Sequence, residues 1–217
     1  MNTLPKNMLH IGFTGGPFCG KTKTFSAIQK EFANIYKDSN IEFLYAPEAA
    51  TAILEEDPSL SNKGLSFQLK VMNHQMTSIE KAIEFAIENP EKLCILISDR
   101  TILDGLMYLT EEECRLFNFD VLSKYYTRVV CFDFHSSFLR DAQARGSNKV
   151  RKEQSAEEFQ VLADKLYEIA KLDWLTKKVL WVNPCDTLQR KQEYVRDMLI
   201  DWVITPASRN FFAKEKK

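Results

Sequence analysis

The sequence lacks several features that define whole classes of protein. None of its apolar runs approaches the length needed to cross a membrane, and its N-terminal segment has no long apolar core of the kind found in secretory signals. The 29 Lys and Arg residues nearly balance the 30 Asp and Glu residues, which leaves a formal net charge of -1 and no general attraction to nucleic acid or anionic lipid. We therefore expect a soluble, cytoplasmic protein with no membrane partner, and the charge argues against nucleic acid as a partner.

Cysteine and histidine are few and dispersed. The five cysteines include no C-x-x-C pair; they are Cys19, Cys94, Cys114, Cys131 and Cys185. An odd, scattered set argues for a reducing compartment and against a disulfide framework or a zinc site. The three histidines form no ligand cluster. We expect His10 to lie in the core and His135 to reach at most the rim of a functional site.

One stretch matches a specific motif, the G-x-x-x-x-G-K-T pattern of phosphate-binding P-loops. The apolar run at residues 8–13 is suited to a buried strand, and the apolar residues after the motif recur at helical spacing. Glycines let the backbone curl so that successive N–H groups point inward, and the N-terminus of the following helix adds partial positive charge beneath a phosphate. The predicted nucleotide-binding residues are Gly15, Gly16, Pro17, Phe18, Cys19, Gly20, Lys21 and Thr22.

Three residues of this loop carry individual predictions. Lys21 would reach the outer phosphates of ATP and the Thr22 hydroxyl would ligate Mg²⁺, so ATP and Mg²⁺ are the expected cofactors. Cys19 lies beside inward-pointing N–H groups and close to Lys21, an environment that stabilises a thiolate. We expect Cys19 to be the most readily alkylated thiol; the alternative is a small side chain that points into the core.

Predicted strands and helices alternate along the whole chain. This alternation predicts an α/β fold with a parallel sheet of about five strands and helices on both faces. Together with the P-loop, it predicts the three-layer αβα sandwich of a P-loop NTPase, formed as a single domain over residues 1–217. The predicted strands are residues 8–13, 41–45, 93–98, 128–134 and 179–182.

The helices are predicted from capping signals and apolar spacing. Pro47 favours a helix over residues 49–54, and capping boxes at Thr110 and Ser155 each predict a helix start. The last predicted helix spans residues 188–202, and a polar tail at 213–217 is expected to be disordered. A longer helical stripe before Asn89-Pro90 consists of Leu69, Met72, Met76, Ile79 and Ile83.

Charged side chains follow the ends of two predicted strands, where ligands bind in folds of this kind. Asp99 ends the third strand, and P-loop proteins place an acid there beside the Mg²⁺. Arg100 would neutralise charge on a transferring phosphoryl group, or alternatively form a salt bridge with a nearby carboxylate.

Two further carboxylates are candidates for contacts with the acceptor. Glu48 follows the second strand, where it would orient or deprotonate an acceptor hydroxyl, or serve only as a helix N-terminal acid. Whether Glu48 or Asp99 is the base is left open. Asp104 lies four residues after Arg100, so the two share a face if the segment is helical. Asp104 would then bind substrate, or it is exposed at the surface.

Residues 136–152 are rich in arginine and lysine around a central Gly146-Ser147-Asn148. This composition predicts a mobile lid whose arginines close over the phosphates, with a solvated charged helix as the alternative. Arg145 and Arg151 are the candidate catalytic residues, and whether Arg140 serves in place of either is left open.

The motifs together resemble a small P-loop family that has an AAA-type name and a kinase-like architecture. The matching stretches are residues 15–22, 47–50, 99–108 and 148–151. Ribosylnicotinamide kinase domains are similar, and deoxynucleoside and thymidylate kinases more distantly so, with an acid after strand two and Asp-Arg or Glu-Arg after strand three. The usual glycine after Asp-Arg is Thr101 in this chain. The resemblance implies a nucleoside- or nucleotide-kinase-like fold and a small nucleoside- or nucleotide-like acceptor.

The leading functional hypothesis is a phosphotransferase that moves the γ-phosphate of ATP to such an acceptor, as a monomer or a homodimer. A nucleotide-dependent ATPase switch and a polynucleotide-end kinase are the alternatives; an end kinase needs a basic groove or stacking aromatics. A GTPase is not favoured, because the chain contains no D-x-x-G sequence.

Overall fold

The computed structural model describes residues 4–16, 19–60, 64–132, 156–171, 177–182 and 187–214. Five strands in this part form one sheet with the spatial order β2-β3-β1-β4-β5, and every neighbouring pair is parallel. The predicted α/β fold with five parallel strands is therefore confirmed. The strands are β1 (Met8–Gly15), β2 (Ile41–Ala46), β3 (Leu93–Asp99), β4 (Arg128–Phe132) and β5 (Val179–Val182).

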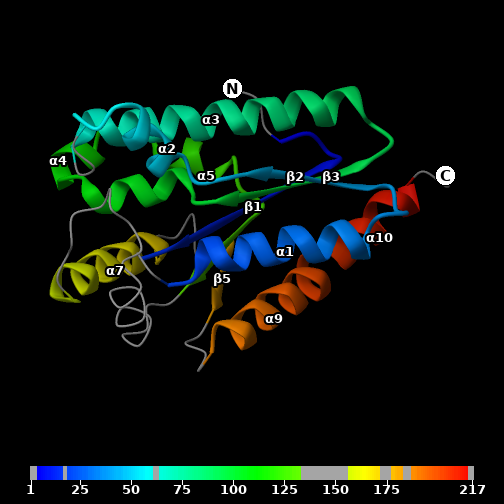
Figure 1. Cartoon of the computed structure of the whole chain (residues 1–217). Coiled ribbons are helices and arrows are strands. Elements are labelled where there is room, and N and C mark those ends of the chain that lie inside the picture. The colour runs from blue at the N-terminus through cyan, green and yellow to red at the C-terminus, as the bar shows by residue number, and fades with distance from the viewer. Residues whose placement is uncertain are drawn as a thin grey trace.

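Helices cover both faces of the sheet, which gives three layers (Figure 1). The helix α3 (Leu65–Glu88) lies on one face, and α1 (Lys21–Ile35) and α9 (Leu188–Leu199) lie on the other. The remaining helical elements are α2 (Ala49–Glu56), η1 (Ile102–Tyr108), α4 (Glu111–Cys114), α5 (Phe119–Ser123), α7 (Ala156–Ala170), η2 (Ile200–Ile204) and α10 (Thr205–Lys214).

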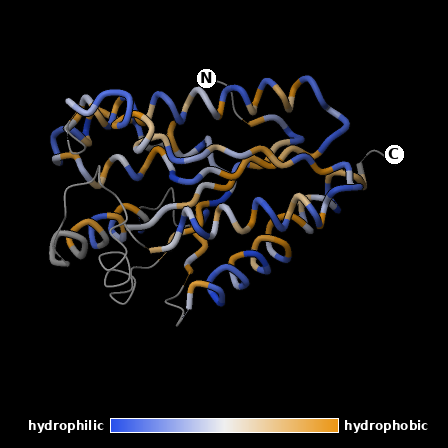
Figure 2. Tube along the Cα trace, in the orientation of Figure 1, coloured by the Kyte–Doolittle hydropathy of each residue, from blue (hydrophilic) through white to orange (hydrophobic). Residues whose placement is uncertain are grey.

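The continuous apolar run at 93–98 forms β3, an interior strand that lies between β2 and β1. All seven of its residues are buried, because helices cover both faces of a parallel sheet. Ile95 and Ile97 pack in the core on the side of α1, whereas Cys94 and Leu96 pack on the side of α3. Figure 2 shows the same arrangement as hydrophobic colour concentrated along the strands.

The strand register brings the predicted site residues to one edge of the sheet. Phe13 of β1 pairs with Asp99 of β3, and Ala46 of β2 pairs with Ser98 of β3. The phosphate-loop motif, Glu48 and Arg100 follow these strands directly. They therefore lie together beyond the carboxyl ends of three adjacent strands.

Several local predictions hold in the described residues. Thr110 and Glu113 form the predicted capping box, α2 begins at Ala49, and α7 begins at Ala156. One residue of the predicted apolar stripe on α3 does not face the core: Leu69 is 45% exposed, whereas Met72, Ile79 and Ile83 are buried. The predicted disordered tail at 213–217 begins too early, because α10 continues to Lys214. The rest of that tail, the predicted lid at 136–152 and the end of the fourth strand at 133–134 lie outside the described residues.

The predicted end of the last helix at Trp202 is wrong. The chain passes from α9 through the π-helical turn η2 into α10, which continues to Lys214. Pro206 lies in the first turn of α10, where the missing N–H of proline is best tolerated. No helix of the described part is both long and apolar enough to span a bilayer.

Candidate functional site

The phosphate loop connects β1 to α1 through two glycines in the positive-φ region. Gly15 has φ 147° and Gly20, the N-cap of α1, has φ 91°. A Cβ atom at position 15 would lie 2.6 Å from the Phe132 carbonyl oxygen, so no larger residue fits there. Both glycines of the motif are thus required by the backbone. Pro17 and Phe18 lie outside the described residues.

Lys21 turns back into the loop. Its buried ammonium donates hydrogen bonds to the Gly15 carbonyl at 2.6 Å and the Gly16 carbonyl at 2.7 Å, and lies 3.3 Å from Cys19 Sγ. The Cys19 side chain is 0% exposed and belongs to the core beneath α1. The structure therefore contradicts the expectation of an accessible Cys19 thiol and agrees with the alternative of a small core side chain.

Thr22 and Asp99 meet at the start of α1. The Thr22 hydroxyl hydrogen-bonds to the buried Asp99 carboxyl group, whose Oδ1 atom contacts no hydrogen-bonding partner among the described residues. Burial raises the pKa of Asp99, and the Thr22 hydrogen bond and the Lys21 charge oppose this rise. Mg²⁺ prefers oxygen ligands such as carboxylates. Thr22 and Asp99 supply a hydroxyl group beside a carboxyl oxygen that has no hydrogen-bonding partner among the described residues, so they fit the predicted metal.

Glu48 and Arg100 form an ion pair at the ends of β2 and β3. Arg100 Nε lies 3.0 Å from Glu48 Oε1, and the two side chains are only 10% and 15% exposed. Burial disfavours the charge of Arg100, but the carboxylates of Glu48 and Asp104 outweigh it and raise its pKa further above the ordinary value. The alternative prediction of a salt bridge for Arg100 is therefore correct, and the bridge joins two predicted site residues.

Arg100 has an unusual backbone conformation. Its φ of 117° lies in a region that non-glycine residues rarely adopt, at a cost of about 1–3 kcal/mol. Thr101, where the resembling family has glycine, has an ordinary extended conformation with φ -105° and caps η1. The strained residue is thus the arginine itself, and such strain is concentrated at functional sites.

Asp104 lies beneath this pair and is buried. Its carboxylate accepts hydrogen bonds from the Thr14 hydroxyl at 3.1 Å and the Thr101 N–H at 2.6 Å, and lies 3.5 Å from an Arg100 nitrogen. The alternative of an exposed Asp104 is wrong. Arg100 and Asp104 do not share a helical face, because the helix η1 begins only at Ile102, but their side chains still meet as an ion pair. In this arrangement Asp104 holds Arg100 and Thr14 in place.

Comparison with known proteins agrees with this geometry. A family model described as "AAA domain" matches residues 10–178, which is most of the chain and includes the phosphate loop, Glu48 and Asp99. The chain belongs to this AAA domain family. It is therefore a P-loop NTPase with a kinase-like fold.

A solved structure shows the same fold as this AAA domain. Thymidylate kinase from Ehrlichia chaffeensis superposes with a TM-score of 0.55 at 15% sequence identity, over 88% of this chain and 98% of that chain. No curated protein sequence matches this chain. The kinase-like architecture is shown by these findings, and the similarity to ribosylnicotinamide kinase domains remains a resemblance of motifs.

Other buried residues of the AAA domain support the site through contacts that no sequence pattern predicts. His10 is in the core as predicted; its Nδ1 lies 2.6 Å from the Tyr125 carbonyl oxygen and its Nε2 lies 2.7 Å from Ser98 Oγ. The Tyr126 hydroxyl accepts the Ile102 N–H at 2.8 Å. These contacts hold β1, which leads into the phosphate loop, and β3, which ends at Asp99. They join segments more than 20 residues apart, so residue spacing gave no signal for them.

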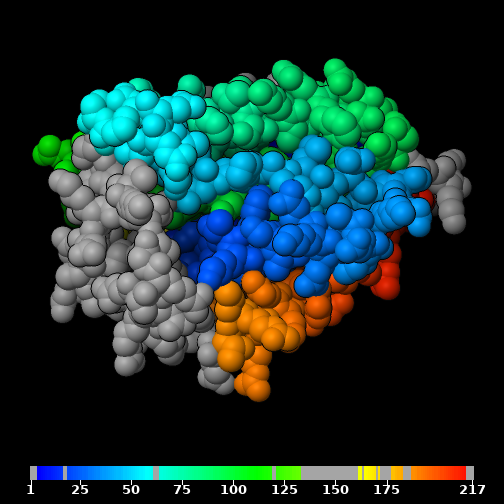
Figure 3. Space-filling model, in the orientation of Figure 1, coloured from blue at the N-terminus to red at the C-terminus, as the bar shows by residue number. Residues whose placement is uncertain are grey.

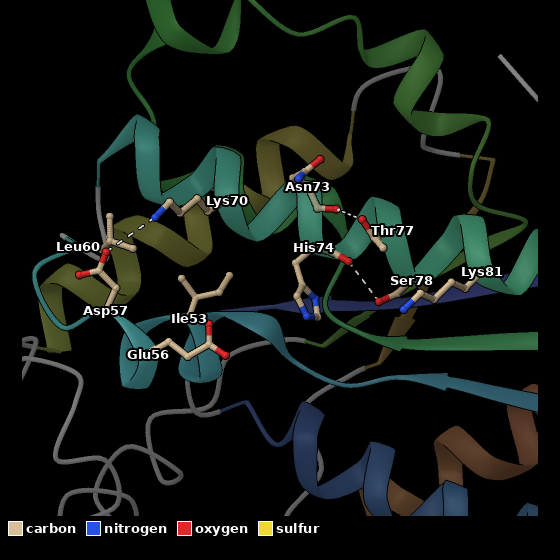
Figure 4. A pocket seen from close by; sticks show the side chains of 10 residues that line it. All are labelled: Ile53, Glu56, Asp57, Leu60, Lys70, Asn73, His74, Thr77, Ser78 and Lys81. Carbon is tan, nitrogen blue, oxygen red and sulfur yellow. Dashed lines mark hydrogen bonds and ion pairs between the residues drawn. The ribbon is translucent and has the colours of Figure 1, made fainter.

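A separate hollow of about 420 Å³ lies between α2 and α3, away from the predicted site residues. Figure 4 shows its wall of mixed charge, where Lys70 and Asp57 approach to 3.8 Å and Glu56 and His74 project nearby. Of the predicted catalytic and nucleotide-binding residues that the structure describes, none lines this hollow. The candidate active site of the AAA domain is therefore the loop-side edge of the sheet.

Proposed function

We propose that this protein is an ATP-dependent phosphotransferase that acts on a small nucleoside- or nucleotide-like acceptor. One observation carries the proposal: three groups with separate chemical roles converge beyond the ends of β1, β2 and β3. They are the Lys21 ammonium, the Thr22–Asp99 oxygen pair and the Glu48–Arg100 ion pair. The fold shared with a thymidylate kinase supports a nucleotide-like acceptor.

The donor side is the phosphate loop. Its N–H groups and Lys21 would bind the phosphates of ATP, and Thr22 and Asp99 would hold Mg²⁺. When bound, Mg²⁺ neutralises the charge that develops on the phosphate oxygens. The partnerless Oδ1 of Asp99 supports this role, because a metal would satisfy a buried oxygen that the described residues leave without a hydrogen bond.

The acceptor side is the Glu48–Arg100 pair. Glu48 would take the proton of the acceptor hydroxyl as that oxygen forms its bond to the γ-phosphorus and the bond to the ADP oxygen breaks. Arg100 would stabilise the charge on the transferring group. Asp99 hydrogen-bonds to Thr22 and is the proposed ligand of the metal. We therefore propose Glu48 as the base. We assign Asp104 a positioning role through Arg100 in place of substrate contact. Arg140, Arg145 and Arg151 lie outside the described residues.

An acceptor screen tests the proposal. ADP formation is measured with nucleosides, nucleotides and nicotinamide ribosides, for the wild type, Lys21→Ala and the control Lys23→Ala, which changes an exposed lysine two positions away. We expect slow ATP turnover alone, acceleration by a particular acceptor, and a loss of about 10²–10³-fold in Lys21→Ala only. Turnover that no small acceptor accelerates, but that a protein partner does, would support the ATPase switch instead. Acceleration by oligonucleotide ends would support the polynucleotide kinase.

A further inference from the structure

A second lysine reaches the phosphate loop from the far end of the chain. Lys191 lies in the first turn of α9 and is 0% exposed, and its ammonium donates a 3.1 Å hydrogen bond to the carbonyl oxygen of Cys19, 172 residues away in the sequence. Removing an ammonium group from water is costly, so a lysine buried at this position requires a specific reason.

The first turn of α9 fits closely against the loop. A Cβ atom at Gly20 would lie 3.1 Å from Leu188 Cδ1 and 3.9 Å from Lys191 Cδ. Figures 1 and 3 show α9 running alongside α1, and Gln192 continues this contact by donating to the Lys23 carbonyl at 3.2 Å. The loop is therefore held from two sides: Lys21 binds the Gly15 and Gly16 carbonyls, and Lys191 binds the Cys19 carbonyl.

The Lys191 hydrogen bond sets the direction of a backbone N–H. The described residues contain no cis peptide bond, and in a trans peptide the C=O and the N–H point in opposite directions. With the Cys19 carbonyl directed toward α9, the Gly20 N–H is directed away from α9. Gly20 immediately precedes Lys21 and belongs to the run of N–H groups that binds phosphate in a P-loop.

We infer that Lys191 is a positioning residue for nucleotide binding: it fixes the Cys19–Gly20 peptide so that the Gly20 N–H is presented to the phosphates. The inference rests on the proposed function, in that it takes the loop to bind ATP.

Binding measurements separate this role from catalysis. Calorimetry with Mg²⁺ and a non-hydrolysable ATP analogue, and separately with inorganic triphosphate, is applied to Lys191→Met, the control Gln192→Met and Lys21→Ala. Methionine keeps the length and apolar contacts of the lysine stem and removes only the ammonium group. We expect Lys191→Met to bind both ligands about 10- to 100-fold more weakly, at a melting temperature close to that of the wild type.

The control variant removes a bond of the same kind from the neighbouring residue, but one made to α1 and not to the loop. We expect Gln192→Met to keep wild-type affinity. A folded Lys191→Met with wild-type affinity for both ligands would overturn the inference, while loss of binding in Lys21→Ala would leave the proposed function standing. A wild-type protein that binds neither ligand would refute both.

A second variant covers the case in which Lys191→Met does not fold. Lys191→Gln is neutral and one atom shorter, so it cannot span the distance to the Cys19 carbonyl and should lose affinity by a similar factor. Unfolding of both variants would show that Lys191 is required for the fold itself and would overturn the inference.

Discussion

His10 should make the protein sensitive to acid. It is fully buried in β1, between the Tyr125 carbonyl and the Ser98 hydroxyl, with its ring 4.4 Å from the Tyr126 ring. Burial lowers the pKa of His10 from 6.5 to about 4, with the hydrogen bond to Tyr125 opposing the shift. The folded protein therefore keeps this imidazole neutral at pH values where the unfolded chain protonates it.

The sign and size of the effect follow from proton linkage. Between the folded pKa of about 4 and the unfolded value of 6.5, the unfolded chain binds more protons, so the free energy of unfolding decreases as the pH falls through this range. The loss from this one residue amounts to about 2 kcal/mol between about pH 7.5 and about pH 5. That loss is a large fraction of the stability of an ordinary domain.

Urea unfolding at the two pH values measures this contribution. His10→Gln keeps an amide nitrogen within reach of Ser98 but does not titrate, so its stability should fall by about 2 kcal/mol less than that of the wild type on acidification. His74→Gln, which changes an exposed histidine on α3, serves as the control and should behave like the wild type. Equal losses in all three proteins would refute the linkage argument. Activity should be assayed above about pH 7.5, where His10 is largely neutral in both the folded and the unfolded state.

Three other outcomes are expected at the site. Glu48→Gln should lower turnover by about 10²–10⁴-fold with little change in the dissociation constant of ATP; a collapse of ATP binding with unchanged turnover per bound ATP would make Glu48 a nucleotide contact. Asp99→Asn should weaken ATP binding in the presence of Mg²⁺ and leave metal-free binding nearly unchanged, and equal weakening in both calorimetric titrations would exclude a metal role. Cys19 should be alkylated more slowly than the partly exposed Cys114, as judged by peptide mass mapping. Faster labelling of Cys19 would show that the loop opens.

Local patterns were sufficient to predict the sheet and the phosphate loop. The P-loop motif and the apolar run before Asp99 each lie within a few consecutive residues, and parallel β-strands require their polar residues to gather at the carboxyl ends. The prediction of an accessible Cys19 thiol was wrong because it rested on local sequence alone. Its neighbours in sequence indicated an electropositive loop, but the direction of its side chain is set by core packing against Phe132, β1 and α9, which sequence spacing does not encode.

Long-range contacts explain what sequence reasoning missed. Lys191 and Cys19 are 172 residues apart, and Arg100 and Glu48, which form an ion pair, are 52 residues apart. The last helix also continues past its predicted end at Trp202, through the π turn η2 and into α10, which has Pro206 in its first turn. None of these features could be predicted from the spacing of residues in the sequence.

The transfer of labelled phosphate distinguishes a phosphotransferase from an ATPase. ATP carrying ³²P at the γ position is incubated with the wild-type protein, Mg²⁺ and the acceptor that most increases ADP formation, and the products are separated by chromatography. We expect the label to move to the acceptor in proportion to the ADP formed, and Lys21→Ala to slow this transfer by about 10²–10³-fold. Label found only in inorganic phosphate, whichever acceptor is supplied, would contradict a phosphotransferase and leave the site as that of an ATPase.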